Sequence, residues 1–199
     1  MNNHISAIVA DSLDVKRRYF AEHSGEVERA AGMIAEAFAA GGKLLLFGNG
    51  GSSCDAQHIA GEFINRFLPQ NRRALPAIAL STDGGVLTCI ANDTGFDNIF
   101  ARQVEALGAP GDICLAISTS GQSRNIVAAI ERARAAGMKV IGLLGKDGGL
   151  CAPLCDLALV VASDDTQRIQ ETHNLIGHVI CELVELALFT PDGEGKERR

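Results

Sequence analysis

The sequence predicts an α/β protein, a three-layer sandwich in which a five-stranded parallel sheet is flanked by helices and preceded by further helices at the N-terminus. Short, continuous apolar runs alternate with helical patterns, and parallel strands need crossover connections that are usually helices. Two small polar turns each follow an apolar run directly, where open parallel sheets bind their ligands. The predicted strands cover residues 44–47, 76–80, 112–117, 138–144 and 156–161.

The composition fits a single domain over 1–199, with N-terminal helices in 1–42, an α/β core in 43–189 and a charged, mobile tail in 190–199. Hydrophobic residues make up 47% of the chain, enough to bury a sizeable core, and the net charge of −6 argues against a nucleic-acid surface. No apolar run is long enough for a signal peptide or a membrane span. Six cysteines without a C-x-x-C spacing indicate reduced thiols in a cytoplasmic protein.

The N-terminal segment predicts two helices. A loose apolar stripe starts at Ile5 and ends near His23-Ser24-Gly25, and a second helix covers 26–40 until Gly41 and Gly42 stop it. Its alanine-rich face allows close packing, so we expect a helical contact with a second copy of the chain.

A glycine turn follows the first predicted strand. Gly48-Asn49-Gly50-Gly51 leads at once into a helix, so its backbone N–H groups can bind an anion, and Ser52 or Ser53 can cap the helix. A dinucleotide site is the alternative, but Gly48-x-Gly50-x-x-Ser53 lacks the third glycine. A purely structural turn that binds no ligand is a second alternative. His58 and Glu62, four residues apart, share one face of this helix and could be a base and a metal ligand, or simply a solvated polar pair.

The rest of the chain continues the alternation. Before the third strand we expect a short helix through Ile90, a turn at 92–95 and an amphipathic stretch at 96–107. We expect helices at 125–136 and 166–189, before and after the last two strands, and a loop at 145–149.

A hydroxyl-rich loop, Ser118 to Ser123, follows the third strand. Its three serines and one threonine can surround a phosphate together with backbone N–H groups. Ordinary helix capping would explain one or two of these residues but not all four. Farther along, the last helix carries Gln170, His173 and His178. A lone histidine on an apolar face is usually a core residue, but with His58 and Glu62 it could complete a proton-transfer or metal site.

Several motifs together resemble the phosphoheptose isomerase family of sugar-isomerase (SIS) domains, whose fold is flavodoxin-like. They are GNGGS at 48–52, DAQHIAGEF at 55–63, ANDTGFDNIFARQVEALG at 91–108, ISTSGQS at 117–123, GKDGG at 145–149 and RIQETH at 168–173. The resemblance covers nearly the whole chain. It implies isomerisation of D-sedoheptulose 7-phosphate to D-glycero-D-manno-heptose 7-phosphate, the first step towards the ADP-heptose of lipopolysaccharide cores.

The resemblance also implies the site residues. The catalytic pair would be Glu62 as base and His178 as acid. Substrate contacts would fall on Asn49, Gly50, Gly51, Glu62, Asn92, Asp93, Ser118, Thr119, Ser120, Ser123 and Gln170, and one zinc ion per subunit on His58, Glu62, Gln170 and His178. The implied assembly is a cytoplasmic homotetramer with its active sites at subunit interfaces.

Helix geometry complicates this metal set. Residues eight apart on one helix, such as Gln170 and His178, rise by about 12 Å and differ by about 80° in direction. Either the segment bends, both side chains reach far, or a second subunit completes the site, which is the reading we favour.

A second function remains open. Ile64-Asn65-Arg66-Phe67 and residues 75–80 resemble the non-enzymatic branch that binds the replication initiator DnaA. That branch lacks the catalytic acid and base, so the presence of Glu62 and His178 favours the isomerase.

Overall fold

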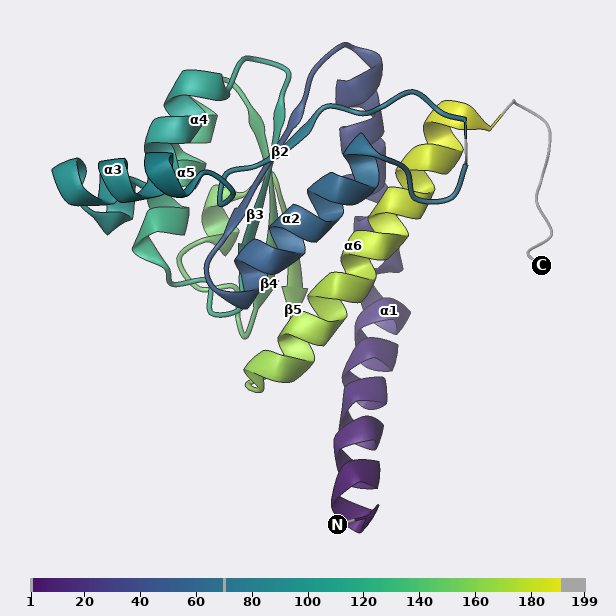
Figure 1. The fold of residues 1–199 in the computed structure, drawn as a ribbon. Coiled ribbons are helices and arrows are strands. Elements are labelled where there is room, and N and C mark those ends of the chain that lie inside the picture. Colours follow the sequence, from purple (N-terminus) through teal and green to yellow (C-terminus); the bar gives the residue numbers. More distant parts are fainter. Residues whose placement is uncertain (1, 70, 191–199) are drawn as a thin grey trace.

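The computed structural model describes residues 2–69 and 71–190, and it confirms the predicted α/β sandwich. All five strands are parallel, in the order β2-β1-β3-β4-β5 (Figure 1). The expected tail lies outside the described residues except for Thr190. The strands are β1 (Leu44–Gly48), β2 (Ala77–Ala79), β3 (Ile113–Ser118), β4 (Lys139–Gly145) and β5 (Leu157–Val161).

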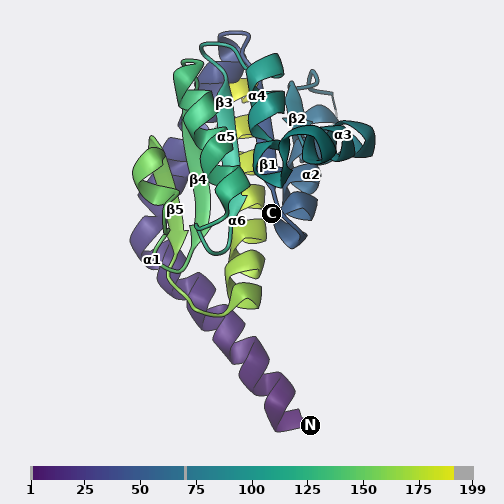
Figure 2. The same ribbon diagram turned by 90° about the vertical axis from the view of Figure 1, so that its left-hand side faces the viewer.

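The sheet separates two apolar cores, and β1 serves both. Leu44 and Leu46 belong to the core beneath α1 (Asn2–Ala39), α2 (Gly51–Ile64) and α6 (Thr166–Phe189), whereas Leu45 and Phe47 face α4 (Ala101–Leu107) and α5 (Arg124–Ala135). Every residue of β1 is buried because successive side chains point to opposite, covered faces. Figure 1 shows the two helical layers on either side of the strands, and in Figure 2 the layer with α4 and α5 faces the viewer.

The strand order creates a switch point between β1 and β3. These neighbours pair in register from Leu44–Ile113 to Gly48–Ile117, so their carboxyl ends lie side by side. From there the chain leaves to opposite layers, through α2 after β1 and through α5 after β3. Such a switch point is the usual ligand site of an open parallel sheet.

The prediction of two N-terminal helices was wrong, because α1 is one helix of 38 residues. A glycine inside a helix costs about 1 kcal/mol relative to alanine. Packing outweighs that cost, since the buried stripe continues through Gly25 from Val15 and Tyr19 to Val27 and Ile34. The N-terminal half of α1 projects beyond the sandwich in Figures 1 and 2.

The helix after β2 is longer than predicted. α3 (Gly84–Thr94) includes Asn92 and Asp93, which were expected in a turn. Asp83 caps its start by accepting a hydrogen bond from Val86 N at 2.9 Å, and Gly95, at φ 94°, follows its end. Two short 3₁₀ helices, at Phe96–Asn98 and Ala152–Leu154, complete the fold.

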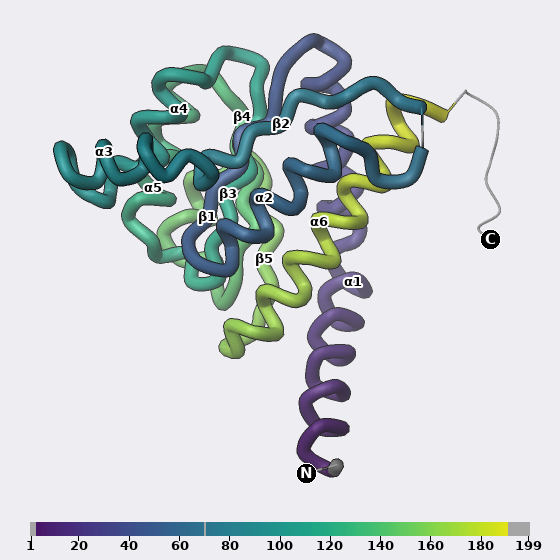
Figure 3. Tube along the Cα trace, viewed as in Figure 1, coloured from purple at the N-terminus to yellow at the C-terminus, as the bar shows by residue number. Residues whose placement is uncertain are grey.

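α6 is long and apolar enough to cross a membrane by length and composition alone, although no such run was expected from the sequence. However, 44% of its most apolar window is buried inside the structure. It lies beside α1 and α2 (Figure 3). Its residues Ile169, Ile176, Ile180 and Val184 belong to the core. Its hydrophobicity is therefore that of a core helix.

Candidate active site

The glycine turn joins β1 to α2 at the switch point. Gly50 adopts φ 54°, and the amides of Ser52 and Ser53 donate to the carbonyls of Asn49 and Gly50 at 3.0 Å each. No side chain in the described ranges caps α2, so the prediction that Ser52 or Ser53 caps it was wrong. The reason is that the turn already supplies backbone acceptors, and the Ser53 hydroxyl donates to Gly50 O instead.

The Ser118–Ser123 loop lies beside this turn. The hydroxyl of Ser118 accepts from Gly121 N at 3.1 Å and that of Ser120 from Gln122 N at 3.2 Å. Ser123 precedes α5, yet within the described residues its side chain makes no capping hydrogen bond. Helix capping therefore does not account for the loop's composition.

An amide pair that was not predicted connects the two loops. Asn49 and Asn125 exchange reciprocal side-chain hydrogen bonds of 2.9 and 2.8 Å, and Asn125 is only 2% exposed. In the sequence, Asn125 is only an amide at the start of a predicted helix, and nothing in that position indicates that Asn49 is its partner. Because the pair spans the turn after β1 and the helix after β3, it holds the two loops together.

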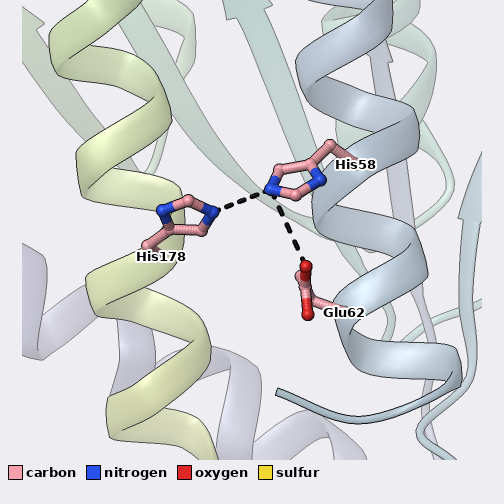
Figure 4. Close-up of side chains that lie close together, drawn as sticks. All are labelled: His58, Glu62 and His178. Atoms are coloured by element: carbon pink, nitrogen blue, oxygen red, sulfur yellow. Dashed lines mark hydrogen bonds and ion pairs between the residues drawn. The ribbon is translucent and has the colours of Figure 1, made fainter. Parts of the chain in front are cut away.

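An imidazole and carboxylate cluster lies between α2 and α6 (Figure 4). His58, Glu62 and His178 each have a ligand atom within 4.8 Å of the others. Nε2 of His58 lies 2.7 Å from Nε2 of His178 and 3.7 Å from Glu62 Oε1. A separation of 2.7 Å is within hydrogen-bond distance for two imidazole nitrogens. The structure thus brings together three of the four predicted metal ligands, including both predicted catalytic residues.

Close helix packing brings these side chains together. A Cβ on Gly177 would lie 2.7 Å from Ile59 Cδ1, so the Ile59 side chain or the helices would have to shift to admit a larger residue here. Gly177 precedes His178 and Ile59 follows His58. The two imidazoles therefore meet beside a tight contact between the two helices.

Gln170 lies elsewhere. Its amide donates to Asp55 Oδ2 at 3.4 Å and packs so closely on the glycine turn that a Cβ on Gly51 would lie 2.1 Å from its Nε2. Burial raises the pKa of Asp55, while hydrogen bonds from Gln170 and Asn174 and the charge of His58 lower it. α6 is one unbroken helix, so Gln170 and His178 remain two turns apart. Gln170 thus borders the glycine turn, as expected of a substrate contact, and does not join the three clustered ligands.

Asn92 and Asp93 are not brought to the cluster within this chain. Both are exposed on α3, where Asn92 donates to Asp93 Oδ1 at 2.8 Å. Figure 1 shows α3 on the far side of the sheet from α6. None of the 11 residues of α3, all of them described, is buried.

His173 is a core residue in this structure. It is 0% exposed and donates from Nε2 to Leu144 O at 2.9 Å, while its Nδ1 has no partner among the described residues. Burial lowers the pKa of His173 to about 4, although the bond to Leu144 opposes this shift.

Acid is therefore expected to destabilise the protein through His173. The imidazole stays neutral when folded but protonates near the ordinary histidine pKa of 6.5 when unfolded, so stability is complete above that pH and falls towards pH 4. The loss reaches about 3 kcal/mol. Urea unfolding of His173→Gln between pH 7 and 4 should lack this component. His4→Gln, on the exposed part of α1, should retain it, and equal slopes for His173→Gln and the parent protein would contradict the assignment.

Comparisons with known proteins agree with this architecture. The fold and its switch-point loops are those of the SIS domain, whose family model matches residues 9–145. A phosphoheptose isomerase of Solidesulfovibrio magneticus is 50% identical over 93% of this chain and 90% of its own length, and one of Pelobacter propionicus is 57% identical over 80% and 84%. The chain belongs to the phosphoheptose isomerase family of SIS-domain proteins.

Solved structures of this family have the same fold. The phosphoheptose isomerase of Neisseria gonorrhoeae superposes with a TM-score of 0.88 at 38% identity, covering 92% of this chain and 98% of its own. That of Francisella tularensis gives 0.89 at 38% identity, covering 92% and 96%. The comparisons give no support to the initiator-binding alternative.

Proposed function

We propose that the protein isomerises D-sedoheptulose 7-phosphate to D-glycero-D-manno-heptose 7-phosphate, the first step towards ADP-heptose for lipopolysaccharide cores. The observation that carries the proposal is the convergence of Glu62 and His178, from separate helices, within one 4.8 Å cluster. Membership of the phosphoheptose isomerase family supports the choice of substrate.

The reaction moves one proton between carbons and one between oxygens. Glu62 takes a proton from C1, and the electron pair left behind forms an enediolate whose charge rests on O2. His178 delivers a proton to O2. His178 then takes the proton of the O1 hydroxyl as the C1 carbonyl forms, and Glu62 returns its proton to C2, which completes the aldose and restores both side chains. Each positioned acid or base contributes about 10²- to 10⁴-fold in rate.

The phosphate is held by neutral groups. In the proposed complex, the loop residues Ser118, Thr119, Ser120 and Ser123 bind the phosphate, and Asn49, Gly50, Gly51 and Gln170 bind the sugar. Backbone amides at the starts of α2 and α5 add favourable helix dipoles. Hydroxyls without a fixed positive charge suit a metabolite that must leave after each turnover.

A homotetramer would supply the remaining contacts. Asn92 and Asp93 lie on a helix without buried residues, and α1 exposes Ile5, Ile8, Val9 and Leu13 at 42–60%. A surface that neighbouring subunits cover in an assembly has both features when a single chain is viewed alone. In the proposed assembly, these helices meet other subunits and a neighbour's α3 completes each site. Light scattering should give four times the chain mass, and a monomer would refute this arrangement.

Zinc is the proposed metal. Two imidazoles and a carboxylate, from His58, His178 and Glu62, form a donor set typical of catalytic zinc sites, whereas the Gln170 amide is an uncommon zinc ligand. Bound zinc would stabilise the negative charge on the enediolate oxygen.

His58→Ala is therefore expected to weaken zinc binding at least 10-fold, because it removes one of three clustered ligands. Competition titration with a chromophoric chelator measures this directly. His23→Ala, on α1 far from the cluster, is the control, and unchanged affinity in His58→Ala would exclude the site.

The proposal includes a cytoplasmic location, where reduced thiols persist. All six cysteines, each within the described ranges, are free, and the pKa values of Cys114, Cys151, Cys155 and Cys181 are raised by burial, which keeps these thiols unreactive.

The deciding experiment is an assay of the purified protein on sedoheptulose 7-phosphate, with the aldose product followed by NMR. We expect turnover of the ketose to the aldose. Intact binding of the sugar phosphate without turnover would instead favour a non-enzymatic module such as the initiator-binding one.

A further inference from the structure

A buried ion pair connects the end of α2 to α6, the two helices that carry the cluster of His58, Glu62 and His178. Arg72, from the segment that connects α2 to β2, meets Glu185 of α6, and their side chains are 1% and 2% exposed. The sequence gives no hint of this pair, since the two residues are 113 positions apart. A buried pair of charges need not stabilise a fold, so its hydrogen bonds indicate what else it does.

On one side, the pair holds the helix turn that carries Glu62. The two terminal nitrogens of Arg72 donate to the carbonyls of Glu62 at 2.6 Å and Phe63 at 2.9 Å. α2 ends at Ile64, so these carbonyls belong to its last turn, which lacks partners within the helix. The guanidinium therefore caps α2 at the residue that bears the proposed base.

On the other side, the pair holds a ring against His178. The Glu185 carboxylate accepts from the backbone amides of Phe67 and Leu68 at 2.8 Å each. The Phe67 ring, fixed in this way, stacks on the imidazole of His178, with centroids 5.5 Å apart and planes 26° apart. Glu185 itself lies seven residues after His178, which places both on the same face of α6.

We propose that Arg72, Glu185 and Phe67 form a positioning unit that sets the proposed base and acid relative to each other. This inference rests on the proposed isomerase function. The guanidinium fixes the backbone of Glu62, the carboxylate fixes the backbone of Phe67, and the phenyl ring fixes the plane of the His178 imidazole. Since the sugar phosphate binds to the loops after β1 and β3, the unit governs the proton transfers and leaves binding largely unaffected.

The kinetic test compares variants that alter the unit mildly. Phe67→Leu removes the stacked ring, and Phe67→Tyr should restore it. Arg72→Lys keeps the charge but loses the planar fork that reaches two carbonyls and a carboxylate together. We expect kcat to fall about 10- to 100-fold in Phe67→Leu and Arg72→Lys, with KM for sedoheptulose 7-phosphate within about twofold and Phe67→Tyr near the parent protein.

Lys43→Met is the matched control, because it removes the side-chain partner of Asp112, another buried carboxylate, which directly precedes β3 and makes no contact with the cluster of His58, Glu62 and His178. It should lower the melting temperature without changing kcat. Unchanged kcat in folded Phe67→Leu and Arg72→Lys would overturn the proposal, as would an equal fall in Lys43→Met.

A second readout does not need the reaction. In chelator-treated protein with labelled histidines, Arg72→Lys and Glu185→Gln should each shift the ring signals of His178, because the stacked Phe67 moves, and leave those of buried His173 in place. Unmoved His178 signals in both variants would refute the positioning unit even if the natural substrate proves to be another sugar phosphate. Absence of turnover in the parent protein, with these shifts present, would refute only the proposed function.

Discussion

Replacing Glu62 by glutamine is expected to lower kcat on sedoheptulose 7-phosphate by about 10²- to 10⁴-fold, because an amide cannot accept the proton that leaves C1. Glutamine has nearly the same shape, so the helix and the neighbouring His58 should keep their places. Calorimetric titration should show that the variant still binds the sugar phosphate, whose phosphate is held by the Ser118–Ser123 loop.

The control for this prediction is Glu105→Gln. Glu105 lies on α4 in a surface ion pair with Arg102, and its loss should leave kcat unchanged. If Glu62→Gln keeps kcat within tenfold of the parent protein, Glu62 is not the base. If it loses binding as well, the carboxylate holds the substrate in the ground state too.

Replacing Gly121 by alanine is expected to destabilise the protein by about 2–4 kcal/mol and to raise KM about tenfold. Gly121 adopts φ 63°, and a Cβ there would lie 2.1 Å from the backbone oxygen of Gly148. Neither backbone can yield without moving its loop. Because the Gly121 amide donates to the Ser118 hydroxyl, the displacement would disturb the proposed phosphate site.

Gly111→Ala distinguishes the effect of the Cβ clash from the effect of the positive φ. Gly111 also has a positive φ, 91°, but a Cβ there would meet nothing within 4 Å. This variant should show only the left-handed strain of about 1–2 kcal/mol and an unchanged KM. Urea unfolding and initial rates measure both quantities. Equal stabilities and equal KM values for the two variants would rule out the clash as the cause.

The sequence was informative where local pattern and layer topology suffice. Alternating strands and helices predicted the parallel sheet and its two covered faces, because each apolar run must be buried on both sides. The polar turns after β1 and β3 were correctly placed at one sheet edge, since parallel strands end together. Helix 166–189 was predicted with the bounds it has, and Asp165 caps it by accepting from Gln167 N.

The N-terminal helices show the limit of local propensity. Gly25 has a low helix propensity and so predicted a helix end. The buried stripe on α1 continues past Gly25, however, and its packing keeps the helix continuous. Asn125, Phe67 and Arg72 were missed for a related reason. Their partners Asn49, His178 and Glu185 are remote in sequence, and no periodicity marks such pairs.

By itself, the sequence determined the layers of this protein and the residue types available at its switch point. The reason is that the spacing of apolar residues, which distinguishes helices from strands and buried faces from exposed ones, is a local property of the chain. Only the tertiary structure decided that His58 and Glu62 meet His178 while Gln170 turns to Asp55. The physical reason is the packing of α6 against α2, which places Gly177 against Ile59 and brings the adjacent imidazoles of His178 and His58 within hydrogen-bond distance.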